Sequence, residues 1–172
     1  MRIGLISDSH HKVDVAKSAI NFLKKKDVDL LVHSGDIVEF ETLRDLKKSQ
    51  IPYVAVLGNN DSNLKSFMKN FKLFNEPKDF IFKDLKIRVM HYPIYISNDF
   101  DINIYGHTHY FVAVVDGKNL VINPGEICGR KKPLYEFAYV DVFDDRYEIY
   151  KISSQIEKID WKISKIDLFK EF

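Results

Sequence analysis

The sequence predicts an α/β fold in which two mixed β-sheets pack face to face, with helices on their outer sides. In the first half, apolar runs alternate with helical segments, a pattern typical of right-handed βαβ units in a largely parallel sheet. In the second half, strand-like runs follow one another across hairpin turns, which indicates antiparallel pairing. The chain has 172 residues, 45% of them hydrophobic, enough for one real core. We therefore expect a single domain over residues 1–172.

The βα half is expected to contain three strands and three helices. The first strand is the apolar run before Asp8 and His10, and a helix of roughly 12 to 14 residues follows it, since apolar positions recur at helical spacing. The second strand covers residues 30–33, and the third, opened by Pro52, covers 53–57. The apolar positions of the helices are Ala16, Ala19, Ile20 and Leu23, then Leu43 and Leu46, and finally Leu64, Phe67, Met68 and Phe71.

The second half is expected to be built from hairpins and one additional strand. Asp116-Gly117-Lys118-Asn119 is a strong hairpin turn, because Asp, Asn and Gly adopt the left-handed conformation that such turns require. The predicted pairs are 80–82 with 87–90, 112–115 with 120–122 and 135–142 with 147–152, and the additional strand is 102–105.

The C-terminal segment fits two patterns. Its isoleucines from Ile152 to Ile166 are spaced by threes and fours, as on one face of a helix, whereas Ile159, Trp161 and Ile163 alternate as on a strand. We expect a helix from about residue 155 onward. Residues 153–172 then form an extension that packs on the domain or serves self-association in a homodimer or higher homo-oligomer.

Composition excludes several classes of protein. Lys and Arg number 26 against 25 Asp and Glu, a formal net charge of +1, so no global field draws the chain to nucleic acid or an anionic membrane. Cys128 is the only cysteine, and neither a signal-peptide pattern nor an apolar run of membrane-spanning length is present. We expect a cytoplasmic protein with no membrane or nucleic-acid partner.

Oxygen and imidazole side chains follow the ends of several predicted strands. Asp8 and His10 are two residues apart, so on an extended backbone their side chains leave the same face. Because no thiolate belongs to the set, Mn²⁺, Fe²⁺, Ni²⁺ or Zn²⁺ suits it better than copper(I) or an iron-sulfur cluster. Seven ligands are too many for one tetrahedral ion and suit a pair of ions that share a carboxylate. The seven candidates are Asp8, His10, Asp36, Asn59, His91, His107 and His109.

These motifs, in this order, resemble the calcineurin-like metallophosphoesterases, and they are most similar to the small single-domain phosphodiesterase branch of archaea and bacteria. The resemblance covers about residues 1–150 and implies an αββα sandwich with two divalent ions. Mn²⁺ or Ni²⁺ is expected first, with Fe²⁺ or Zn²⁺ as alternatives. The resemblance implies that Asp8, His10, Asp36 and His109 hold the first ion, and that Asp36, Asn59, His91 and His107 hold the second.

The charges of such a site favour an anionic substrate. Two divalent ions carry four positive charges, of which Asp8, Asp36 and a bridging hydroxide cancel three. Coordination lowers the pKa of bound water from 15.7 toward about 7. The expected reaction is attack of this hydroxide on a small phosphoester, most simply a phosphodiester.

Two positions depart from the family pattern. Asn60 stands where many members have His or Cys, and an amide cannot act as a general acid. We therefore predict a preference for substrates with acidic leaving groups. His91-Tyr92-Pro93 replaces the usual His-Gly-His, which leaves the pocket wall beside the second ion open or closed by Tyr92 and Tyr95. Asp61, the second candidate catalytic residue beside Asn60, either orients a neighbouring ligand or caps a helix.

Four further polar residues have modest expected roles. His33 supports Asp36 or packs at its strand end, and His11 is solvated. Glu126 either approaches the site or only forms a turn. Cys128 is structural unless a nearby metal makes its thiol redox-sensitive.

Two other functions compete with the hydrolase. The retromer subunit has this fold and acts as a scaffold after losing metal ligands, whereas here every ligand position is filled. A nuclease related to the double-strand-break repair enzyme would need added DNA-gripping segments and a basic stripe, which this balanced charge does not supply.

Overall fold

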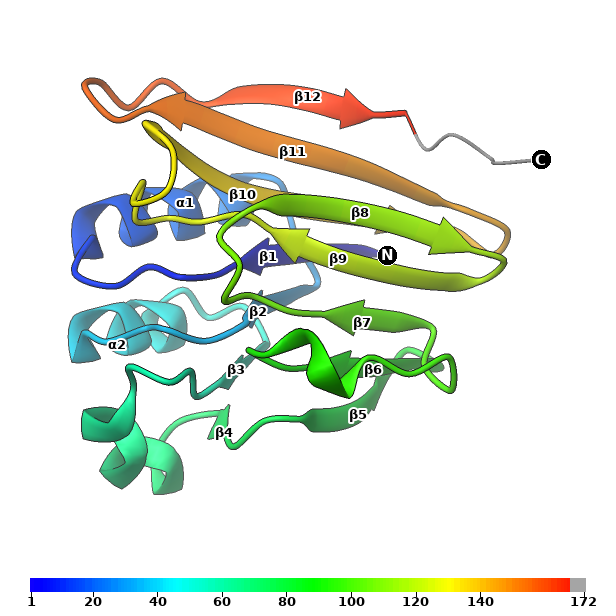
Figure 1. The fold of residues 1–172 in the computed structure, drawn as a ribbon, viewed down its shortest axis with the longest axis horizontal. Coiled ribbons are helices and arrows are strands. Elements are labelled where there is room, and N and C mark those ends of the chain that lie inside the picture. The colour runs from blue at the N-terminus through cyan, green and yellow to red at the C-terminus, as the bar shows by residue number, and fades with distance from the viewer. Residues whose placement is uncertain (168–172) are drawn as a thin grey trace.

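The computed structural model describes residues 1–167, which form two β-sheets packed face to face (Figure 1). The larger sheet has the strand order β12-β11-β10-β1-β2-β3-β4, and the smaller has the order β5-β6-β7-β9-β8. This confirms the predicted α/β class with two mixed sheets. The strands are β1 (Arg2–Ile6), β2 (Leu30–His33), β3 (Tyr53–Val56), β4 (Leu73–Phe74), β5 (Lys78–Phe82), β6 (Leu85–Val89), β7 (Ile102–Ile104), β8 (Phe111–Asp116), β9 (Asn119–Pro124), β10 (Leu134–Val142), β11 (Tyr147–Gln155) and β12 (Lys162–Ile166).

Two hydrophobic cores hold the layers together, and strand alternation assigns side chains to each. Ile3 and Leu5 of β1 belong to the core between the sheets, while Ile6 belongs to the core between the larger sheet and its helices. Each buried aliphatic side chain contributes roughly 1.5–3 kcal/mol relative to an exposed one. Both faces of the larger sheet are therefore covered, and its central strands are fixed precisely.

The first half follows the predicted βαβ order. Strands β1, β2, β3 and β4 pair in parallel, with α1 (Val13–Lys25) and α2 (Phe40–Lys48) on the connections. Helix α1 has 13 residues, as its spacing predicted. The third predicted helix is instead the 3-10 helix η1 (Ser62–Lys69), and the short strand β4 after it was not predicted.

The second half forms the predicted hairpins, but its strands divide between both sheets. The β10–β11 hairpin joins the larger sheet, where β10 pairs antiparallel with β1. In the smaller sheet β7 pairs in parallel with both β6 and β9. The prediction that the whole second half is antiparallel was therefore wrong for β6–β7 and β7–β9. Contacts between strands that are distant in sequence determine the direction of these pairs.

The predicted helix from about residue 155 onward is wrong within the described residues. Strand β12 pairs antiparallel with β11. Trp161 packs its ring edge-on against Phe137, with 4.8 Å between ring centroids, and its Nε1 donates a hydrogen bond to Ser18 Oγ at 3.0 Å. These contacts favour the alternating pattern over the helical one. The last part of the predicted helix, residues 168–172, lies outside the described residues.

Little covers the outer face of the smaller sheet. The segment between β6 and β7 contains only the 3-10 helix η2 (Pro93–Tyr95), and Ile81 and Ile94 are 70% and 75% exposed. Within residues 1–167, no helix combines the length and apolarity needed to cross a bilayer. Helices α1 and α2 pack against the larger sheet.

Candidate metal centre

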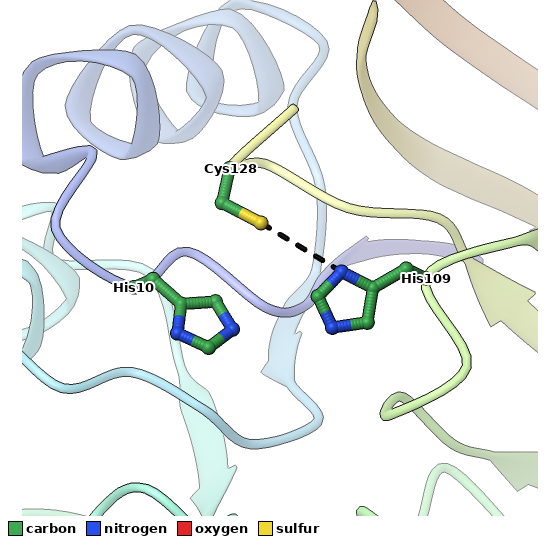
Figure 2. A group of neighbouring side chains, drawn as sticks. All are labelled: His10, His109 and Cys128. Carbon is green, nitrogen blue, oxygen red and sulfur yellow. Dashed lines mark hydrogen bonds between the residues drawn. The ribbon is translucent and has the colours of Figure 1, made fainter. Parts of the chain in front are cut away.

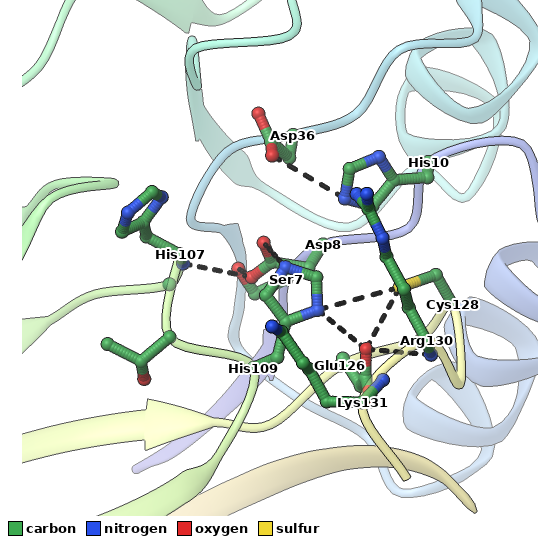
Figure 3. Close-up of polar contacts among 12 residues, drawn as sticks. Ser7, Asp8, His10, Asp36, His107, His109, Glu126, Cys128, Arg130 and Lys131 are labelled. Atoms are coloured by element: carbon green, nitrogen blue, oxygen red, sulfur yellow. Dashed lines mark hydrogen bonds and ion pairs between the residues drawn. The ribbon is translucent and has the colours of Figure 1, made fainter. Parts of the chain in front are cut away.

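The candidate ligands lie on loops that follow the carboxyl ends of five strands. Asp8 and His10 follow β1, and Asp36 follows β2. Asn59 follows β3, His91 follows β6, and His107 and His109 follow β7. Because parallel strands of both sheets end at the same edge, the structure brings all seven predicted ligands into one cluster, part of which is drawn in Figure 3.

The ligand loops have a strained backbone. Asp8, His10, Asp36, His107 and His109 all have positive φ, with values of 50°, 44°, 54°, 64° and 66°. Non-glycine residues rarely adopt this left-handed conformation, and each instance costs of order 1–3 kcal/mol unless the surroundings enforce it. The expectation that Asp8 and His10 converge on an extended backbone was therefore wrong. They reach the same cluster through a left-handed backbone at both residues.

Asp8, His10, Asp36 and His109 lie close together. Asp8 Oδ1 is 3.2 Å from His109 Nε2, and His10 Nε2 is 3.5 Å from Asp36 Oδ2. The rings of His10 and His109 face each other, with their centroids 5.6 Å apart. These are the residues that the family resemblance assigns to the first ion.

The second group is centred on His91. His91 Nε2 is 3.5 Å from Asp36 Oδ1 and 3.1 Å from Asn59 Oδ1. The His107 ring lies 5.1 Å from the His91 ring between centroids, and the backbone N–H of His107 donates to Asp8 Oδ2 at 3.1 Å. One ligand atom each from Asp8, Asp36 and His91 lies within 4.8 Å of the others. Asp36 thus contacts both groups.

Two buried atoms in the cluster fit a metal better than they fit a metal-free interior. Asp8 Oδ1 and His10 Nε2 are buried and have no hydrogen-bond partner among the described residues. Burying a polar group without a partner costs roughly 1–3 kcal/mol. Since both atoms are predicted ligands of the first ion, the donor set fits the divalent cation that the family implies.

The electrostatics of the ion-free cluster favour the metal-binding forms of Asp36, His10 and His107 but not of His91. Burial lowers the pKa of His91, but the hydrogen bond to Asp36 and the charges of Asp8 and Asp36 outweigh burial and raise the pKa to about 9, so an ion that binds there displaces a proton. Burial raises the pKa of Asp36, but this effect is outweighed by the hydrogen bond and charge of His91 and by two hydrogen bonds from Asn60, which lower the pKa below its usual value. Burial lowers the pKa of His10 and of His107, so both stay neutral near pH 7. Burial raises the pKa of Asp8, a shift that His91 opposes.

The histidines of the centre are held by groups that sequence reasoning missed or left open. Glu126 is fully buried, and its Oε2 accepts a hydrogen bond from His109 Nδ1 at 2.6 Å. Ser34 O lies 2.9 Å from His91 Nδ1, and the Glu76 carboxylate accepts the backbone N–H of His91. Such partners orient a ligating imidazole and select its tautomer. For Glu76, 15 residues before His91, the sequence contains no recognisable signal.

Asn60 and Asp61 organise the loops around Asp36. Asn60 donates from its backbone N and from Nδ2 to Asp36, at 2.9 and 2.8 Å. Asp61 precedes η1 but makes no side-chain capping bond. Its buried carboxylate accepts the N–H groups of Gly58 and Val38, both at 2.7 Å. Asp61 therefore joins the loop after β2 to the loop after β3.

The remaining polar candidates lie around the cluster. His33 is buried with Nε2 3.0 Å from Ser9 Oγ, and burial lowers its pKa to about 3. His11 is exposed and pairs with Glu39 at 2.5 Å. Cys128 Sγ lies 3.7 Å from His109 Nδ1, and a ligand atom of His10 is also within 4.8 Å of it (Figure 2).

Tyr92 stands beside the second group. Its ring centroid is 4.1 Å from that of His107. Tyr95, the other tyrosine considered for this wall, is 36% exposed, and its carbonyl accepts a hydrogen bond from Arg88 at 2.9 Å. Tyr92 is therefore the tyrosine that contacts the centre.

Sequence comparison points to one family. The model of the calcineurin-like phosphoesterase superfamily domain matches residues 1–145. Phosphodiesterase MJ0936 of Methanocaldococcus jannaschii is 33% identical over 142 residues, 75% of this chain and 86% of that relative. A probable metallophosphoesterase of the same organism, MJ0623, is 30% identical over 164 residues, 84% of this chain and 77% of the relative.

Solved structures show the same fold. A novel archaeal phosphodiesterase aligns with a TM-score of 0.73 and 27% identity over 88% of this chain and 99% of that one. Vacuolar protein sorting 29 from Cryptosporidium parvum aligns with a TM-score of 0.74 over 96% of this chain and 97% of that one. At 21% identity, the second likeness concerns the fold alone.

Proposed function

Because this chain belongs to the calcineurin-like phosphoesterase superfamily, we propose that it is a phosphodiesterase that uses two divalent metal ions. The observation that carries the proposal is the meeting of seven oxygen and nitrogen ligands at one sheet edge, with Asp36 shared by both groups. The archaeal relative named as a phosphodiesterase supports the diester in particular.

The ligands divide into two sets around Asp36. Asp8, His10 and His109 would hold the first ion together with Asp36, and Asn59, His91 and His107 would hold the second. We expect Mn²⁺ or Ni²⁺, with Fe²⁺ or Zn²⁺ as alternatives, because the set combines imidazoles with carboxylate and amide oxygens and has no thiolate. When bound, such ions supply Lewis acidity and a water of lowered pKa.

The chain itself contributes the charge of the site and the positions of its ligands. Asp8 and Asp36 carry only two negative charges, so a site with two divalent cations remains positive and favours an anionic phosphoester. Asn60 holds Asp36 through two hydrogen bonds and offers no titratable proton to a leaving group. Glu126 fixes His109 in one orientation. We expect a small cytoplasmic phosphoester as substrate.

A scaffold function is the second candidate, since vacuolar protein sorting 29 shares the fold. In this chain every predicted ligand position carries a ligating side chain, and five of these residues have a strained backbone. A protein that only binds partners has no need to maintain that strain. The structure therefore favours the hydrolase over the scaffold.

Metal analysis of the purified protein, combined with an assay of bis(p-nitrophenyl) phosphate, separates the two functions. The hydrolase should contain or take up about two divalent ions per chain and release p-nitrophenol. Chelation should abolish this activity, and added Mn²⁺ should restore it. Metal-loaded protein without turnover of any aryl phosphodiester would favour the scaffold.

The Asp36→Asn variant tests the shared ligand. We expect turnover to fall by more than about a hundredfold, because even residues that only orient a ligand contribute 10–100-fold. The circular dichroism spectrum should be unchanged. Asp145→Asn, which changes an exposed carboxylate in the β10–β11 turn, is the matched control and should keep full activity. Activity of Asp36→Asn within a few-fold of the parent would contradict the assignment.

A further inference from the structure

A cavity of about 490 Å³ opens beside the candidate metal centre. His10 and Asn60 belong to its wall, so the cavity borders the first group of ligands and the residue that holds Asp36. A substrate whose phosphorus lies at the centre can extend into this space. The lining residues are His10, His11, Lys12, Val38, Asn60, Cys128 and Arg130.

The cavity has an excess of positive charge. Arg130 and Lys12 are exposed, and within residues 1–167 neither side chain has an ion-pair partner or a hydrogen bond. The carboxylate of Glu39 is bound to His11, a third residue of the wall. Arg130 and Lys12 share the wall of the cavity with His10, so the two free cations lie beside the ligand cluster.

The backbone of Arg130 is held by the same carboxylate that binds a candidate metal ligand. Glu126, which binds His109, also accepts the backbone N–H of Arg130 at 2.9 Å and those of Lys131 and Lys132 at 2.7 and 3.1 Å. Figure 3 shows Glu126 between His109, Cys128 and Arg130. When its backbone is fixed in this way, a recognition residue stays at a constant distance from the reacting centre. Arg130 thus has the position of a specificity residue.

We propose that Arg130 and Lys12 bind a second phosphate group of the substrate, so that the enzyme prefers phosphodiesters that carry a further phosphate. The inference rests on the proposed phosphodiesterase function and names its substrate class. A guanidinium binds phosphate through two parallel N–H bonds, and an ammonium adds a point charge. The side chains are free for this role because no carboxylate of the described residues occupies them.

Two chromogenic diesters that differ only in the second phosphate test the proposal. Thymidine 5′-(p-nitrophenyl phosphate) and its 3′-phosphorylated form release the same p-nitrophenol. We expect the 3′-phosphorylated ester to have a kcat/KM about tenfold higher, mainly through KM. Arg130→Ala should remove this preference, and Lys12→Ala should reduce it. Arg146→Ala, at the far end of β10 and β11, is the matched control and should keep it.

Binding measurements separate failure of this inference from failure of the proposed function. Thymidine 3′,5′-bisphosphate should bind the metal-loaded protein about tenfold more tightly than thymidine 5′-monophosphate in calorimetry, and Arg130→Ala should equalise the two. If this preference is observed without turnover, only the phosphodiesterase function fails. Equal binding by the parent protein, or a preference that survives Arg130→Ala, would falsify the second-phosphate site.

Discussion

At the scale of single residues, the candidate centre combines side chains and backbone conformations that destabilise the folded state. Asp8 and Asp36 are buried carboxylates, and both have a left-handed backbone, as do three of the histidines. Gly35 belongs to the same set, since a Cβ at its position would lie 2.6 Å from His91 Nδ1. These local costs are consistent with selection for a ligand cluster rather than for stability.

We expect Asn60 to determine which leaving groups the enzyme tolerates. Because an amide cannot donate a proton in the required pKa range, we expect rates to fall steeply as the leaving group becomes less acidic from aryl to alkyl diesters. Asn60→His should flatten this dependence and speed alkyl diesters by about a hundredfold relative to aryl ones, within the range of general-acid contributions. The measurement is a plot of log kcat/KM against leaving-group pKa.

Asn63→His is the control for that experiment, because Asn63 lies three residues later, in η1, and its side chain donates to the carbonyl of Val38. It should leave the steep dependence unchanged. A flat dependence in the parent protein would mean that another residue supplies the proton.

His33 makes the stability of the metal-free protein depend on pH. Burial holds its folded-state pKa at about 3, whereas the unfolded residue has a pKa near 6.5. Below pH 6.5 the unfolded chain therefore binds a proton that the folded chain does not, and the free energy of unfolding decreases as the pH falls. Each pH unit in this range is worth about 1.4 kcal/mol for one proton.

His33→Gln isolates this contribution. Between pH 6.5 and 5, we expect the parent protein to lose about 2 kcal/mol more stability than the variant in urea unfolding. Other histidines titrate equally in both proteins and cancel in the comparison. Parallel pH profiles would show that His33 becomes protonated without unfolding.

At the scale of elements, the strands fix where the ligand loops begin, and the loops orient the candidate ligands. Strands β1 and β2 are buried on both faces, which fixes the starting points of the loops that contain Asp8 and Asp36. Asp61 then joins the loop after β2 to the loop after β3 through two backbone N–H groups. A few buried carboxylates thus set the spacing of elements that are distant in sequence.

The last strand pairs with β11, and Trp161, directly before it, adds contacts with β10 and α1. We expect Trp161→Ala to reduce the free energy of unfolding by about 2 kcal/mol, because it removes an edge-to-face contact with Phe137 and a hydrogen bond to Ser18. The kcat for bis(p-nitrophenyl) phosphate should not change. The measurement is urea unfolding at pH 7.

Ile163→Ala is the matched control on β12, since Ile163 is 43% exposed. Its effect should stay within about 0.5 kcal/mol. If Trp161→Ala leaves stability unchanged and instead alters the oligomeric state, residues 153–172 serve self-association rather than packing on the domain.

At the scale of the whole molecule, ion binding should stabilise the fold. Both sheets contribute ligands, so the ions link the two layers, and they also satisfy the buried Asp8 and His10 atoms that lack partners. A ligand that binds only the folded state adds about 2.7 kcal/mol at a concentration of 100 times its Kd. Mn²⁺ added to chelated protein should therefore raise Tm by several degrees.

Asp36→Asn should lose most of this rise, whereas potassium chloride of equal ionic strength should not produce it. Differential scanning calorimetry of the chelated and Mn²⁺-loaded proteins provides both comparisons. An identical Tm with and without Mn²⁺ would show that the cluster binds no divalent ion in the folded state.

The order of the elements and the candidate ligands could be predicted from short segments of the sequence. The βαβ order, the hairpin turns and the seven strand-end ligands follow from hydrophobic periodicity and from the chemistry of each side chain, which act within a few residues of one another. The family motifs were recognisable for the same reason, since each occupies one short loop.

Only the tertiary structure decided the rest. It assigned β10–β12 to the larger sheet, replaced the C-terminal helix by a strand, and turned the Asp8–His10 loop into a left-handed conformation. It also brought Glu126 to His109 and placed Arg130 at the cavity. These features depend on contacts between segments far apart in the chain, whose free energies no local pattern records. The sequence therefore predicted the candidate ligands, and the packing of both sheets determined how they are held.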